Sequence, residues 1–112
     1  MFSSSCATYG VPSELPLTER SAQHPINPYG WSKLIDEQMI RDVAQITPGF
    51  SYALLRYFNV AGAALDGSLG EQHDPEPHLI PKVLMAGLNP DHELTIYGND
   101  YPTPDGTCVR DF

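Results

Sequence analysis

The sequence has few cysteines and few basic residues, and each shortage excludes a class of protein. Only two of its 112 residues are cysteines, Cys6 and Cys108, and they stand in no metal-binding or redox spacing. We therefore expect two small buried thiols in a reducing compartment, the cytoplasm. Lys and Arg total 6 against 14 Asp and Glu, a net charge of −8. A nucleic-acid-binding protein presents a basic patch, so we expect no nucleic-acid partner.

The sequence also lacks a long apolar run and a histidine pattern suited to metal. No stretch approaches the roughly 20 apolar residues that span a bilayer, and Met1 and Phe2 lead directly into serines without a secretory signal. We expect no membrane association. The four histidines show no ligand spacing, so no metal site is expected; they are His24, His73, His78 and His92.

The first half of the chain predicts strand, loop, helix and strand. Met1–Ser5 is typical of a strand end, and Asn27 offers a helix N-cap before Pro28 at the first helical position. The almost unbroken apolar run Phe50–Phe58 is typical of a parallel strand buried on both faces. Thr47-Pro48-Gly49 predicts the end of the helix. Apolar residues recur at helical spacing and predict a buried stripe, namely Trp31, Leu34, Ile35, Met39, Val43 and Ile46.

The second half is richer in Gly, Pro and acidic residues and predicts shorter elements. Residues 64–77 are expected to form a loop, followed by a short helix from about His78 to Gly87. Leu94–Tyr97 and Thr107–Phe112 predict short strands on either side of a turn-rich loop. Two parallel strands and one helix cannot cover both faces of a sheet. We therefore expect an α/β fold that is part of a doubly wound, Rossmann-like parallel sheet, plus the start of a smaller substrate-binding domain.

Tyr29 and Lys33 form the most informative pair. Positions i and i+4 lie on one face of a helix, so the phenol and the ammonium are predicted to lie side by side. A neighbouring cation favours the phenolate form of a tyrosine, which can then take a proton from a sugar or alcohol hydroxyl. The run Ser3–Ser5 stands upstream, at the expected carboxyl end of a strand. Ligands collect at such strand ends in open α/β sheets, which also places Asn59 near the chemistry.

Five segments carry a family resemblance: FSSSCATYG from Phe2, NPYGWSK from Asn27, LLRYFN from Leu54, GNDYPTPDG from Gly98 and VRD from Val109. Together they resemble the UDP-glucose 4-epimerase family, within the extended short-chain dehydrogenase/reductase superfamily. The resemblance covers essentially the whole chain and implies an internal fragment, about a third of such an enzyme. Residues 1–63 would be the C-terminal part of an NAD-binding Rossmann-like domain. Residues 64–112 would be an incomplete UDP-sugar-binding region.

The resemblance implies an isomerase of galactose metabolism that interconverts UDP-galactose and UDP-glucose through a transient 4-keto sugar, with tightly bound NAD. Ser5, Tyr29 and Lys33 would be catalytic: Tyr29 as acid and base on the sugar 4-hydroxyl, Lys33 supporting it, and Ser5 passing the proton. These three and Phe58 would contact NAD. A homodimer packed partly through the Tyr29 helix is also implied. Beyond Ser5 and Tyr29, the implied UDP-sugar contacts are Asn59, His78, Leu79, Thr95, Ile96, Tyr97 and Arg110.

Three alternatives are weighed against this interpretation. Sugar-nucleotide 4,6-dehydratases place an acidic pair where this chain has Ser5 and Cys6, which disfavours elimination. Epimerases of UDP-pentoses or UDP-glucuronate fit the same residues. A truncated, non-catalytic gene product is the third alternative. The sequence contains no G-x-G-x-x-G turn, the usual cradle for a dinucleotide pyrophosphate, so we expect the 112-residue chain alone to be inactive.

Overall fold

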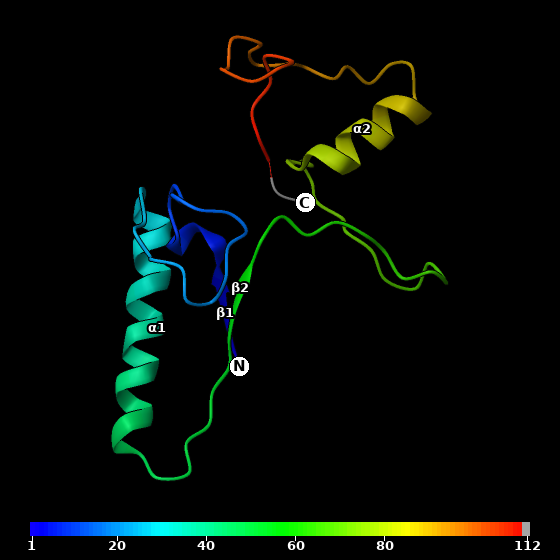
Figure 1. Ribbon diagram of the computed structural model, residues 1–112. Helices are drawn as coiled ribbons and strands as arrows, with labels where there is room; N and C mark the ends of the chain where they lie inside the picture. The colour runs from blue at the N-terminus through cyan, green and yellow to red at the C-terminus, as the bar shows by residue number, and fades with distance from the viewer. Residues whose placement is uncertain (111–112) are drawn as a thin grey trace. The chain divides into compact units, whose positions relative to one another are not determined.

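A computed structural model describes residues 1–110 and resolves the chain into two units (Figure 1), Met1–Phe58 and the part from Asn59 on. Asp111 and Phe112 lie outside the described residues. The elements, in chain order, are β1 (Phe2–Ser5), the 3₁₀ turn η1 (Cys6–Thr8), α1 (Pro28–Ile46), β2 (Leu54–Tyr57) and α2 (Leu79–Leu88). None of the described helices is long and apolar enough to cross a membrane.

The first unit is a parallel β-α-β arrangement. β1 pairs with β2 in parallel, with Phe2 opposite Leu54 and Ser5 opposite Tyr57. α1 connects them and runs alongside the two strands (Figure 1). Parallel strands need such a crossover, because a tight hairpin can join only antiparallel strands. The prediction of an α/β fold with a parallel sheet is confirmed.

α1 begins and ends where the sequence predicts. The Asn27 side chain accepts a hydrogen bond from the Gly30 N–H at 2.8 Å, and Pro28 occupies the first helical position. Thr47 has extended backbone and ends the helix. Gly30 is buried, and a Cβ there would lie 2.5 Å from the Ala7 carbonyl oxygen. The first turn of α1 therefore packs against η1 at backbone distance.

The predicted buried stripe of α1 is wrong for five of its six residues, which are exposed, while Leu34 is half-buried. Along α1, Trp31, Ile35 and Met39 are each at least half exposed. Lys33 and Glu37 instead contact β1 through Ser3 and Ser4, and Gly30 packs against η1. The expected strand Phe50–Phe58 is also shorter, Leu54–Tyr57, and its last residue is 46% exposed. The reason is geometric, since a two-stranded sheet of four-residue strands is too small to bury two faces.

Among its described residues, which end at Arg110, the second unit contains one regular element, α2. The prediction of a helix from about His78 to Gly87 is confirmed, with His78 at the N-cap and Asn89 at the C-cap. Two predicted strands are wrong: neither Leu94–Tyr97 nor residues 107–110 form a strand. The last two residues of the predicted strand Thr107–Phe112 lie outside the described residues. A strand needs a partner for its backbone N–H and C=O groups, and neither segment pairs with one.

The loop from Gly98 to Gly106 is turn-rich, as predicted. The Tyr101 N–H donates to the Gly106 carbonyl, and Gly106 adopts φ +72°, a conformation that favours glycine. Cys108 follows and is exposed, while Cys6 is half-buried. The expectation of two buried thiols is therefore wrong for Cys108, because the segment around it does not enter a packed layer.

Candidate functional site

The Tyr29–Lys33 pair occupies the first turns of α1. The Lys33 ammonium lies 5.7 Å from the centre of the Tyr29 ring and 5.0 Å from that of Phe2. Its Nζ donates to the Ser3 carbonyl oxygen at 3.0 Å, which ties the helix to β1. The Tyr29 side chain is 55% exposed. The structure thus holds an accessible phenol beside a fixed cation, as the i, i+4 spacing predicts.

Ser5 lies at the carboxyl end of β1, where the chain turns into η1. Its Oγ accepts a hydrogen bond from the Ala7 N–H at 3.2 Å, and its carbonyl accepts one from the Thr8 hydroxyl at 3.0 Å. A serine hydroxyl has one donor and two acceptor positions, so accepting from Ala7 leaves its own O–H hydrogen able to donate. η1 packs on the first turn of α1 at Gly30. The end of β1 and the beginning of α1 therefore share one edge of the unit.

A buried ionic network fixes this edge. Glu37, one helical turn after Lys33, is fully buried and receives two hydrogen bonds from Arg56 on β2, at 2.7 and 2.9 Å. The Ser4 hydroxyl on β1 donates to the same carboxylate at 2.5 Å. Arg56 also donates to the Tyr9 hydroxyl at 2.7 Å. One carboxylate thus links α1, β1 and β2, and through Arg56 the loop after η1.

The protonation of this network follows from its contacts. Burial by itself raises the pKa of Glu37, but the hydrogen bonds from Arg56 and Ser4 and the charge of Arg56 outweigh it and lower this pKa to about 2. The hydrogen bond to Glu37 raises the pKa of Arg56, against the effect of burial. Both groups are charged at neutral pH, and the pair is the strong bidentate kind. The sequence reasoning missed Glu37 and Arg56; an acidic residue at i+4 from Lys33 was the available signal.

Phe58 follows Tyr57, the register partner of Ser5, and so leaves the sheet at the same edge. It is 43% exposed and lines an open hollow of about 500 Å³ together with Tyr9 and Arg56. The residues that line this hollow include neither Tyr29 nor Lys33. The structure therefore places Phe58 at the edge where β1 ends, in a hollow that Tyr29 and Lys33 do not line.

The other predicted site residues belong to the second unit. Asn59 begins it, His78 caps α2, and Leu79 is the first residue of the helix, 48% exposed. The three residues predicted to border a uracil lie in an extended segment and are exposed: Thr95, Ile96 and Tyr97. Arg110 is exposed and is the last residue that the structure describes. Among the described residues of this unit, the predicted site residues form two groups that are adjacent in sequence, His78 with Leu79 and residues 95–97.

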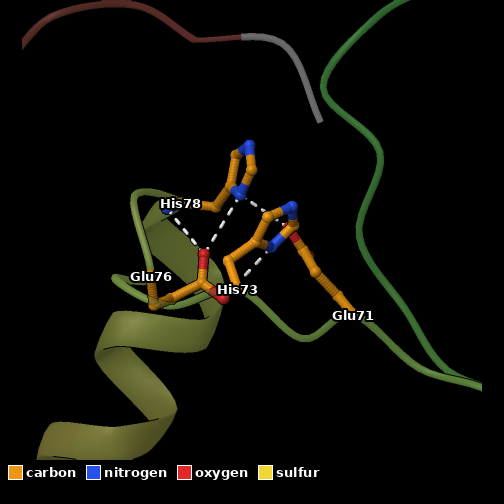
Figure 2. Close-up of side chains that lie close together, drawn as sticks. All are labelled: Glu71, His73, Glu76 and His78. Carbon is orange, nitrogen blue, oxygen red and sulfur yellow. Dashed lines mark hydrogen bonds and ion pairs between the residues drawn. The ribbon is translucent and has the colours of Figure 1, made fainter.

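A cluster that sequence reasoning missed lies just before α2 (Figure 2). One nitrogen from each of His73 and His78 and one oxygen from each of Glu71 and Glu76 lie within 4.8 Å of one another. Hydrogen bonding from the His78 backbone N–H lowers the pKa of Glu76, and the neighbouring imidazoles add to this effect. The spacing E-x-H-x-x-E-x-H was the available signal. The sequence reasoning found no ligand spacing among the four histidines and so did not anticipate this cluster.

Comparison with known proteins identifies the family. The sequence profile described as "NAD dependent epimerase/dehydratase family" matches residues 1–112. The chain belongs to this family. The family resemblance of the five segments is therefore confirmed.

Three similar proteins are UDP-glucose 4-epimerases. That of Lactobacillus helveticus is 53% identical over 112 residues, which are 100% of this chain and 34% of the relative. The solved structure from Brucella ovis in complex with NAD is 61% identical with a TM-score of 0.81, over 96% of this chain and 33% of that one. The structure from Bifidobacterium longum in complex with NAD+ and UDP is 48% identical with a TM-score of 0.85, over 98% and 33%. The chain spans about a third of the length of these relatives.

The residues of the first unit fit the reactive half of a nicotinamide nucleotide. Lys33 spends one of its three N–H donors on the Ser3 carbonyl, which leaves donors suited to a pair of ribose hydroxyls. Tyr29 presents its phenol beside that ammonium. A pyrophosphate cradle of the G-x-G-x-x-G kind is not among the 112 residues. The donor set fits the nicotinamide riboside part and not the diphosphate.

Proposed function

We propose that these residues form the proton-transfer part of a UDP-glucose 4-epimerase, the enzyme that interconverts UDP-galactose and UDP-glucose. The observation that carries this proposal is the half-exposed Tyr29 phenol beside the Lys33 ammonium, at the edge where β1 ends. The relatives support it, since they are UDP-glucose 4-epimerases at about half identity.

In this proposal Tyr29 is the catalytic acid and base. Its Oη takes the proton of the sugar 4-hydroxyl and later returns it, and the Lys33 ammonium lies beside its ring at 5.7 Å. Ser5 donates its hydroxyl hydrogen to the same sugar oxygen. NAD, when bound, supplies a hydride acceptor and donor at sugar C4, which makes a transient 4-keto sugar accessible. Lys33 and Tyr29, with Ser5 and Phe58 nearby, would hold its nicotinamide riboside.

The remaining residues serve the nucleotide part of the substrate. Residues 1–63 would carry the cofactor side and residues 64–112 the UDP-sugar side. Asn59 would contact the sugar, and Arg110 offers a guanidinium fork to a phosphate. His78 and Leu79 would approach the diphosphate, and residues 95–97 would border the uracil. The exposure of Leu79, Ile96 and Tyr97 supports this role, because a side chain must be accessible to receive a ligand.

We also propose a homodimer packed through α1, in the cytoplasm. The outward face of α1 exposes Trp31, Ile35 and Met39, each by at least half. Such a contiguous apolar face is typical of an interaction surface. A charged residue there, as in Ile35→Glu, should convert a dimer into monomers in analytical ultracentrifugation, whereas Gln38→Glu on the same helix should not.

A chimera tests the proposed activity. In it, this chain replaces the matching third of the Lactobacillus helveticus enzyme, to which it is 53% identical over its whole length. We expect the chimera to retain NAD and to convert UDP-galactose to UDP-glucose, while the 112-residue chain alone does neither. Preferred turnover of a UDP-pentose or of UDP-glucuronate would instead favour the alternative epimerases. A folded chimera that turns over none of these would contradict the proposal and favour a non-catalytic gene product.

A further inference from the structure

The cluster before α2 gathers four side chains from one short segment (Figure 2). The His78 Nδ1 lies 2.6 Å from the Glu71 Oε1 and 3.0 Å from the Glu76 Oε1. The His73 Nδ1 lies 3.4 Å from the Glu71 Oε1 and 3.5 Å from the Glu76 Oε2. The two imidazole rings are 4.8 Å apart at their centres and tilted by 60°. Each histidine therefore points the same ring nitrogen at the same two carboxylates.

The Glu76 carboxylate is held in place while the imidazoles are accessible. The Glu76 Oε1 accepts the backbone N–H of His78 at 2.9 Å, which orients the carboxylate and turns its Oε2 toward His73. The Glu76 side chain is 8% exposed, whereas those of His73 and His78 are 46% and 49% exposed. His78 occupies the N-cap of α2, yet its side chain makes no capping hydrogen bond. The His78 ring contacts Glu71 and Glu76 instead of the helix backbone.

We propose that Glu71, His73, Glu76 and His78 form a binding site for one divalent transition-metal ion of the zinc class. This goes beyond the proposed epimerase activity and departs from the expectation of no metal site, which rested on histidine spacing alone. Two imidazole nitrogens and two carboxylate oxygens are zinc ligands, and mixed nitrogen and oxygen ligands favour zinc, cobalt or nickel over magnesium and calcium. Two carboxylates also balance the charge of a divalent cation.

The distances agree with this assignment. Tetrahedral bonds of about 2.1 Å place neighbouring ligand atoms about 3.4 Å apart. The two contacts of His73 already have this length, at 3.4 and 3.5 Å. The contact between His78 and Glu71 is shorter, at 2.6 Å, so a bound ion would move these two atoms apart. The separation would then widen by about 0.8 Å, and the half-exposed His78 ring is free to make this movement. The ion would join the loop to the start of α2.

The test is a titration of the 112-residue chain with Zn²⁺ by isothermal calorimetry, with Mg²⁺ and Ca²⁺ as comparison ions. We expect one equivalent of Zn²⁺ to bind and neither comparison ion to compete at a hundredfold excess. Co²⁺ should give the visible absorption of a tetrahedral nitrogen and oxygen site. No stoichiometric binding, or equal binding of Mg²⁺, would overturn the proposal and leave the cluster as a set of ion pairs.

Variants locate the ion. His73→Ala and His78→Ala should each weaken Zn²⁺ binding by more than about 100-fold, since even residues behind the ligands contribute 10- to 100-fold. Glu71→Gln keeps the shape of the side chain and should weaken binding similarly. His92→Ala and His24→Ala, outside the cluster, are the matched controls and should change nothing. Binding that survives in His73→Ala and His78→Ala would refute the assignment. Circular dichroism checks that the variants keep the helix content of the parent.

Discussion

The polar contacts inside the first unit differ from those inside the second. In the first, one carboxylate, Glu37, collects hydrogen bonds from Ser4 and Arg56, which are 33 and 19 positions away in the sequence. In the second, side-chain hydrogen bonds such as those from Ser68 to Asp66 and from Thr103 to Thr107 join residues two to four positions apart, and the ion pair of His78 with Glu71 spans only seven. Long-range polar contacts fix how elements lie on one another, whereas short-range ones only shape turns. The Tyr29–Lys33 pair, to which we assign the proton transfer, belongs to the first unit.

Removing the Glu37 carboxylate should destabilise the first unit, because its long-range hydrogen bonds meet at this group. Glu37→Gln leaves Arg56 buried without its charge partner, and breaking a buried ion pair typically costs about 3–5 kcal/mol. We expect a loss of this size in the free energy of unfolding, measured by urea denaturation. Asp42→Asn on the exposed side of α1 is the matched control and should cost less than about 0.5 kcal/mol. A loss below about 1 kcal/mol for Glu37→Gln would show that the network does not hold the unit.

Acid should weaken the first unit through the same carboxylate. The pKa of Glu37 is lowered from 4.5 to about 2 in the folded chain, so the unfolded chain binds this proton first as the pH falls. The stabilisation is complete above about pH 4.5 and is lost as the pH falls toward 2, by about 3 kcal/mol in total. Urea denaturation between about pH 5 and pH 2 measures it. An equally steep acid loss in Glu37→Gln would assign the effect to other groups.

The same substitution should have opposite effects in the two helices. In Gly30→Ala the new Cβ would lie 2.5 Å from the Ala7 carbonyl oxygen, and such overpacking costs about 1–3 kcal/mol. In Gly87→Ala, within α2, the Cβ would meet nothing within 4 Å, and alanine favours helix over glycine by about 0.5–1 kcal/mol. Thermal denaturation of both variants measures this. If both variants changed the melting temperature equally and in the same direction, α1 would not approach η1 this closely.

The sequence predicts local structure well and burial poorly. The limits of α1 follow from Asn27, Pro28 and Thr47-Pro48-Gly49, which act within one turn of the backbone. The pairing of Tyr29 with Lys33 follows from helix geometry alone. The exposure of Trp31 and Ile35 does not, because helical spacing identifies an apolar face without saying what covers it. The cluster of His73 and His78 escaped prediction because its spacing belongs to a loop, where no fixed period applies.

The central claim is that the Tyr29 hydroxyl performs the proton transfer, and Tyr29→Phe in the chimera tests it most directly. Removing only this oxygen should lower kcat for UDP-galactose by about 10²–10⁴-fold, the usual contribution of a general acid–base group, while NAD stays bound. Tyr52→Phe, at a tyrosine of similar exposure, is the control and should keep kcat within about twofold. Turnover by Tyr29→Phe equal to that of Tyr52→Phe would contradict the account.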